Sequence, residues 1–229
     1  MAVYKNIRHF STRSTVTLRE TRTNTWKQFK KDFPYLGVMA IGVAFIGWLA
    51  ENILREIAVG VIDCRYHLLP FISPYGLAVF GLYLLLGDAD HIAFFGKPLF
   101  KERTKKTKIL SNIICFILPC LLVFSGEILV GHLWDWCFGV ELWDYNNQPF
   151  HITQYSGVLP AVGAGGACYL AFKFIFYPVL GFLKRKLSKR AAKWICWTLG
   201  VAVVLDTVFM GAQIVIFKQS PMYWAIRLR

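Results

Sequence analysis

The stretch Ile109–Val130, ILSNIICFILPCLLVFSGEILV, contains a single charged side chain, Glu127. As an α-helix it is long enough to cross the hydrocarbon core of a bilayer, which takes roughly 17–25 mainly apolar residues. Four further apolar stretches have similar or slightly shorter lengths: Pro34–Leu54, Phe71–Gly87, Val158–Phe182 and Trp194–Phe217. The sequence therefore predicts an all-α, polytopic membrane bundle of about five spanning helices.

Composition supports a lipid environment, because 56% of the residues are hydrophobic and only 17% are charged. The mean hydropathy of +0.46 agrees with this interpretation. Phe71–Gly87 is the shortest stretch and contains Pro74 and Gly76. It is therefore predicted to be either a fifth span or a tilted, partly re-entrant segment.

The basic residues predict the orientation of the bundle. Eight of the 26 lie within residues 1–33, six within 88–108 and six within 183–193, whereas residues 140–157 contain no Lys or Arg. Basic residues concentrate in cytoplasmic connections, so this alternation places the amino terminus in the cytoplasm and residues 140–157 outside. Concentration in alternate connections also explains the net charge of +13 without nucleic acid as a partner.

Three regions follow: a basic cytoplasmic arm (1–33), a transmembrane domain (34–217) and a carboxyl-terminal tail (218–229). An odd number of spans places the tail outside, although it carries Lys218, Arg227 and Arg229. A tail that lies along the interface through Met222, Tyr223 and Trp224, or a different helix count, would reconcile the two.

Three carboxylates fall inside the predicted spans, where an ionised group is costly unless it is paired, protonated or hydrated. Glu51 and Glu127 lie near the outer ends of two helices that run in the same direction, so both are predicted at similar depth. Asp206 lies midway along the last span, with Gln213 two turns further on. The alternative to a functional site is structural: Glu51 paired with Arg55, and Glu127 bonded to a Trp or Tyr.

Small residues predict which faces of the helices pack against protein. On the first span they form the stripe Ala40, Ala44, Gly47, which continues to Glu51. The third span has Cys120, Glu127, Gly131 and Trp134, and the fourth has Gly157, Ala161 and Gly165. Small residues let neighbouring helices approach closely, so Glu51 and Glu127 are predicted to face protein.

The six cysteines have no CxxC spacing and predict no metal site. Cys64 and Cys137 both fall at the predicted outer face, where a disulfide could persist, but their spacing leaves the bridge open. The chain also lacks GxxxxGK[ST], GxSxG and HExxH motifs, so no cofactor is predicted. If ATP drives this protein, a separate ATPase subunit must bind it.

Several motifs together resemble one family. They are GWLAE at Gly47–Glu51, Arg65 with Pro70, Tyr75-Gly76, Gly126-Glu127, and LWDYNNQPF at Leu142–Phe150. Over residues 40–185 they are similar to the ABC-transporter type IV family, the CmpB-like permeases. The resemblance implies a permease. The chain departs from the family pattern at His151–Gln154 and at Cys64-Arg65-Tyr66.

The matched residues Tyr75, Trp143, Asp144 and Tyr145 all fall on the predicted outer side, with Glu51 and Glu127 below them. This predicts a cup with aromatic walls and acidic groups, suited to an organic cation, a proton or a metal ion. We interpret the chain as a permease component in the cell membrane, working with an ATPase subunit or as a homo-oligomer. The alternatives are a structural or assembly subunit, or an intramembrane enzyme that uses Glu51 and Glu127.

Overall fold

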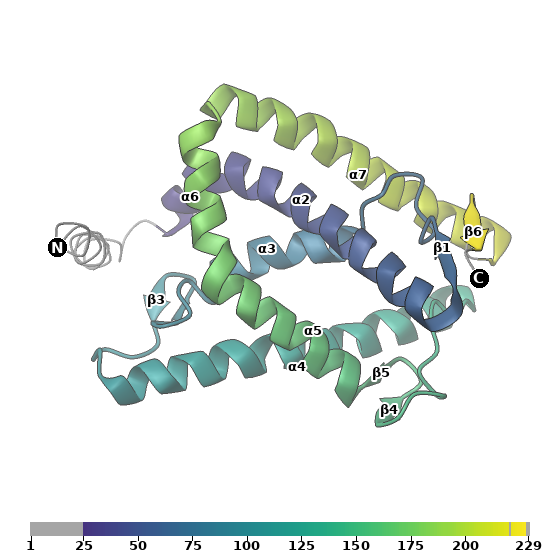
Figure 1. The fold of residues 1–229 in the computed structure, drawn as a ribbon, viewed down its shortest axis with the longest axis horizontal. Coiled ribbons are helices and arrows are strands. Elements are labelled where there is room, and N and C mark those ends of the chain that lie inside the picture. The colour runs from purple at the N-terminus through teal and green to yellow at the C-terminus, as the bar shows by residue number, and fades with distance from the viewer. Residues whose placement is uncertain (1–24, 220, 228–229) are drawn as a thin grey trace.

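The computed structural model describes residues 25–219 and 221–227. Its helices are α2 (Thr25–Val59), α3 (Ser73–Leu85), α4 (Lys105–Phe138), α5 (Val158–Leu170), the π-helical turn η2 (Ala171–Phe176), α6 (Tyr177–Lys186) and α7 (Lys189–Phe217). The predicted all-α membrane bundle is confirmed (Figure 1). Most of the basic arm, residues 1–24, lies outside the described residues, and α2 already includes residues 25–33.

Among the described residues, four helical segments are long and apolar enough to cross a membrane: Trp26–Val59, Lys105–Phe138, Val158–Lys186 and Lys189–Phe217. The third of these is α5, η2 and α6 joined end to end, and it runs obliquely from α4 to the start of α7 (Figure 1). We call the end where α2, α4 and α7 finish the carboxyl end of the bundle, and the opposite end the amino end. Loops 86–104 and 187–188 lie at the amino end.

The predicted second span is a helix of only 13 residues, about 20 Å long, which is too short to cross the core alone. A non-helical segment, residues 64–72, completes its path from the carboxyl end. The Ile72 amide donates to the Ala44 carbonyl oxygen in the middle of α2 (3.1 Å). Irregular backbone at this depth is tolerated where protein covers it. The chain therefore still passes here from the carboxyl end of the bundle to the amino end, and only the second part of this pass, α3, is helical.

The small-residue stripes pack as predicted. Ala40 and Ala44 are buried, and Gly76 of α3 lies so close to the Ala40 carbonyl that an added Cβ would come within 2.7 Å of its oxygen. Gly47 lies under the Tyr75 ring, and Gly165 of α5 meets Cys120 of α4 with no room for a side chain. These contacts set the separations of α2 from α3 and of α4 from α5.

The amino end contains an aromatic and aliphatic core that includes Phe29, Leu36, Val79, Phe172 and Phe176. Within it, the buried carboxylate of Asp32 accepts hydrogen bonds from Tyr83 and Gln28 and pairs with Lys184 at 2.8 Å. Packed aromatic rings therefore fill this end of the bundle, together with one carboxylate that has both hydrogen-bond donors and a basic partner.

Within the described residues, three pairs of short antiparallel strands join loop segments to one another. They are β1 (Val61–Asp63) with β6 (Ala225–Arg227), β2 (Ala93–Phe94) with β3 (Lys97–Pro98), and β4 (His151–Thr153) with β5 (Ser156–Gly157). The β1–β6 pair fixes the carboxyl-terminal tail against the loop that follows α2. The tail therefore lies at the carboxyl end of the bundle.

Candidate functional site

Glu51, near the end of α2, is surrounded by donors. Its Oε2 accepts from Arg65 Nε (2.9 Å) and Nη2, and its Oε1 accepts from the Tyr75 hydroxyl (2.9 Å). Arg65 has a positive φ of 51°, a left-handed conformation that holds its side chain over α2. The charge of Glu51 is therefore balanced within the chain.

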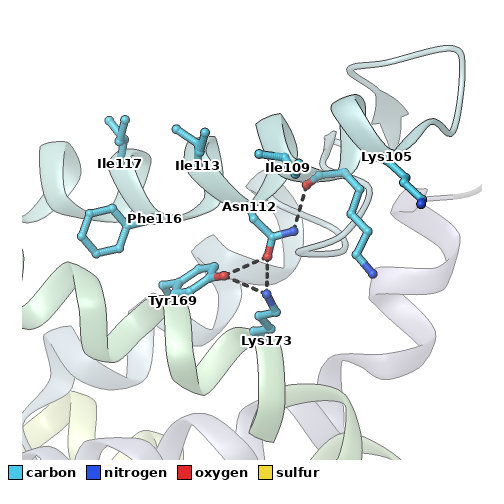
Figure 2. A pocket seen from close by; sticks show the side chains of 9 residues that line it. Lys105, Ile109, Asn112, Ile113, Phe116, Ile117, Tyr169 and Lys173 are labelled. Atoms are coloured by element: carbon cyan, nitrogen blue, oxygen red, sulfur yellow. Dashed lines mark hydrogen bonds between the residues drawn. The ribbon is translucent and has the colours of Figure 1, made fainter.

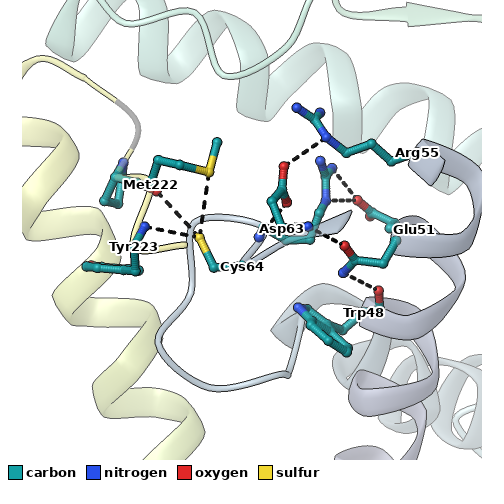
Figure 3. Close-up of polar contacts among 10 residues, drawn as sticks. Trp48, Glu51, Arg55, Asp63, Cys64, Met222 and Tyr223 are labelled. Atoms are coloured by element: carbon teal, nitrogen blue, oxygen red, sulfur yellow. Dashed lines mark hydrogen bonds and ion pairs between the residues drawn. The ribbon is translucent and has the colours of Figure 1, made fainter. Parts of the chain in front are cut away.

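Arg65 belongs to a wider network of alternating charges, shown in Figure 3. The Arg65 amide donates to Asp63 Oδ1 (2.9 Å), and Asp63 Oδ2 pairs with Arg55 Nε at 2.8 Å. The Asp63 amide donates to the side-chain oxygen of Asn52 (2.8 Å). The pairing of Glu51 with Arg55 that the sequence offered as an alternative is wrong, because the loop supplies Arg65 to Glu51 and Asp63 to Arg55.

Glu127, on α4, has a different set of partners. Its Oε2 accepts from the buried hydroxyl of Ser156 (2.5 Å), and its Oε1 accepts from the Tyr145 hydroxyl (3.3 Å). Among residues 25–219 and 221–227, no basic side chain forms an ion pair with Glu127. Ser156 could not be selected from the sequence, since nothing distinguishes it from other loop serines until β5 brings it beside α4.

The structure brings the two carboxylates into one neighbourhood. Glu51 and Glu127 lie within each other's electrostatic range. Tyr145, in the loop after α4, is affected by both carboxylates. Burial, then Glu127 and then Glu51, raise the pKa of its hydroxyl to about 12, while Arg65 lowers this pKa. Glu51, Arg65, Tyr75, Glu127 and Tyr145 therefore form one group at the carboxyl end.

Trp143 and Asp144 stand outside this group. Trp143 Nε1 donates to the Tyr155 carbonyl oxygen (2.8 Å), and its ring meets the Tyr155 ring edge-on. Asp144 is exposed and accepts from the Asn146 amide (2.8 Å). Both side chains shape the loop after α4, and neither contacts Glu51 or Glu127 through a hydrogen bond.

Asp206 occupies a second polar site, eleven residues before the end of α7 and so about 16 Å along its axis. Its carboxylate meets His67 Nδ1 at 3.0 Å and accepts from the amides of Leu68 (2.9 Å) and Leu69 (3.4 Å). Gln213 instead accepts from the Tyr223 hydroxyl (3.2 Å). Asp206 therefore anchors the non-helical segment 64–72 to α7, a role that its position in the sequence does not reveal.

The cysteines form no disulfide. Cys64 is buried, with its sulfur 3.9 Å from the Met222 sulfur, while Cys137 is exposed and unpaired. Within the part of the chain that the structure describes, no cluster of three His, Cys, Asp or Glu side chains could hold a metal ion.

A family model described as "Putative ABC-transporter type IV" matches residues 38–210. The chain belongs to this family. The matched range of the ABC-transporter type IV family includes every member of the Glu51–Glu127 group as well as Asp206, and it ends before Gln213 and the tail. No curated protein and no solved structure matches the chain.

Proposed function

We propose that this chain is the membrane component of a transporter in the cell membrane, and that it recognises a cation or a cationic small solute between Glu127, Glu51 and the rings of Tyr75 and Tyr145. The family assignment supports a transporter component. The observation that carries the choice of a cation is the unpaired carboxylate of Glu127 inside α4.

The proposal centres on Glu127 because the other charged side chains of the group pair with one another. Glu51 and Arg65 neutralise each other, as do Asp63 and Arg55. Within the described residues, the hydrogen-bond partners of Glu127 are two neutral hydroxyls, which orient its oxygens without cancelling its charge. A carboxylate in a span needs a proton or a cation, and the neighbouring aromatic rings add cation–π attraction for an organic cation.

The charge-balanced half of the group supports the alternative of a structural or assembly subunit. Arg65, Asp63, Arg55 and Asn52 form a closed set of contacts between α2 and the loop that follows it. If Glu127 also serves only to hold β5 and the loop after α4, its charge should matter less than its hydrogen bonds. The test must therefore remove the charge and keep the shape.

Binding of sodium, magnesium and choline to the detergent-solubilised protein, followed by isothermal titration and by thermal unfolding, provides this test. Glu127→Gln should weaken binding of the recognised cation by about tenfold or more, because it replaces a charge-assisted contact with a neutral one. Glu141→Gln is the matched control, since Glu141 is an exposed acid in the same loop region. Equal binding by the two variants, or no binding by the wild type, would contradict the proposal.

The proposal also places the carboxyl end outside the cell and an ATPase on the opposite side. In a cysteine-free background, Cys at Asn147 should react with an impermeant thiol reagent in intact cells, whereas Cys at Lys105 or Lys189 should not. All three positions are exposed, so accessibility depends on the side of the membrane. Labelling at Lys105 from outside would reverse the orientation.

A further inference from the structure

A groove on the flank of the bundle, away from the Glu51–Glu127 group, lies between the first half of α4 and the α5–η2 segment (Figure 2). Its volume is about 770 Å³. One wall is a row of apolar side chains on α4, Ile109, Ile113 and Ile117, joined by Phe116. The row extends from Ile109 to Ile117, about 12 Å along the helix.

Three lysines line the half of the groove that is nearer the amino end of the bundle. Lys105 and Lys108 come from the first turn of α4, and Lys173 comes from the π-helical turn η2. Lys108 is balanced by Asp90, whose carboxylate lies 2.6 Å from its Nζ. Lys105 and Lys173 form no ion pair with any described residue.

Within residues 25–219 and 221–227, the hydrogen-bond partners of Lys173 are neutral. Its Nζ donates to Asn112 Oδ1 (2.5 Å) and to the Tyr169 oxygen (2.9 Å), and the Tyr169 hydroxyl also donates to Asn112 Oδ1 (2.8 Å). The nearest acid in this network is Asp90, which accepts from Asn112 Nδ2 (3.1 Å) and is already paired with Lys108. An ammonium group held in a span without an anion is costly, so the groove lacks a negative charge.

We propose that this groove binds an anionic phospholipid, with the phosphate between Lys105 and Lys173 and an acyl chain along Ile109, Ile113 and Ile117. The order of the features matches that of a lipid: charge at the amino end, where headgroups lie, and apolar surface toward the membrane centre. Basic recesses between spanning helices recognise anionic headgroups in this way. The π-helical turn has a role here, because it carries Lys173, which Asn112 and Tyr169 hold beside α4.

Other occupants fit the groove less well. A soluble anion such as inorganic phosphate would leave the apolar wall uncovered. A second copy of this chain, packed groove to groove, would bring its own Lys105 and Lys173 against these lysines. An anionic lipid satisfies both the charge and the apolar surface.

Titration of the purified full-length protein with short-chain phosphatidylglycerol, followed by native mass spectrometry, tests the proposal. Lys105→Gln and Lys173→Met should each weaken binding by about fivefold, the contribution of one lysine to attraction of an anionic lipid. Ile113→Trp should weaken binding by blocking the groove while all the lysines remain. Lys106→Gln is the matched control, because Lys106 lies in the same exposed turn and does not line the groove.

Three outcomes would overturn the proposal. The first is equal loss of phosphatidylglycerol in Lys106→Gln and in the groove variants. The second is equal binding of phosphatidylcholine, which would remove the role of charge. The third is full competition by inorganic phosphate, which would identify a soluble anion as the ligand. If Lys173→Met does not fold, Lys105→Gln and Ile113→Trp still decide the question.

Discussion

Glu51 and Glu127 occupy similar positions near the ends of parallel helices, yet the chain treats their charges differently. Glu51 has a guanidinium partner, Arg65, while the partners of Glu127 in the part of the chain that the structure describes are the hydroxyls of Tyr145 and Ser156. The difference separates two uses of a carboxylate in a membrane. A paired group fixes the packing of a loop on a helix, and an unpaired group remains available to a proton or a cation.

The largest expected effect comes from Asp206, a buried carboxylate with three partners in the segment that precedes α3. Asp206→Ala should lower the free energy of unfolding by about 3 kcal/mol, because His67 and two amides lose their acceptor. Thermal unfolding in detergent measures the effect. Thr207→Ala, which removes only a bond to the Val203 carbonyl of the same helix, is the control and should change little. Equal losses in the two variants would mean that Asp206 does not anchor the non-helical segment 64–72.

Arg65→Met should have the next largest effect, about 2 kcal/mol, since it leaves Glu51 charged and partly buried. The double variant Arg65→Met with Glu51→Gln should recover at least half of the lost stability, because no unpaired charge remains. Comparison of the melting temperatures of the single and double variants measures the coupling. A double variant less stable than Arg65→Met alone would show that the pair is not a charge-balanced unit.

Glu127→Gln should change thermal stability by less than about 1 kcal/mol, because the amide oxygen still accepts one of the two hydroxyl bonds. Its effect should appear instead as the loss of stabilisation by added cation. Unfolding curves with and without the cation, for this variant and for Arg65→Met, separate the two halves of the group. A loss of stability as large as that of Arg65→Met would make Glu127 a structural residue.

The smallest effect concerns Tyr145 and is confined to alkaline pH. Its raised pKa of about 12 means that the folded protein holds this proton more tightly than the unfolded chain, in which tyrosine titrates near 10. The stabilisation from the neutral hydroxyl is therefore complete below pH 10 and is lost as pH rises towards 12. The difference in tyrosinate absorbance between wild type and Tyr145→Phe measures this titration. A transition near pH 10 would mean that the Tyr145 hydroxyl is neither buried nor close to the two carboxylates.

The sequence by itself determined the all-α membrane class and the small-residue faces of α2, α4 and α5 that pack against other parts of the chain. These properties depend on the length of apolar stretches and on helical periodicity, both of which are local. Tertiary structure alone decided that the predicted second span is a 13-residue helix entered through a non-helical segment. Residues 64–72 carry no periodicity that shows how deeply they enter the bundle.

The same distinction applies to the ion-pair and hydrogen-bond partners of the carboxylates. Arg55, one helical turn from Glu51, was the partner that local spacing predicted. In the structure the loop residue Arg65, which has a left-handed conformation, pairs with Glu51 instead, and Arg55 pairs with Asp63. Ser156 and His67 joined Glu127 and Asp206 in the same way, across 29 and 139 residues. The sequence could show that a carboxylate in lipid needs a partner, because that cost is a property of the group. Which residue satisfies it depends on how the loops fold back, and that is decided only by packing of the whole bundle.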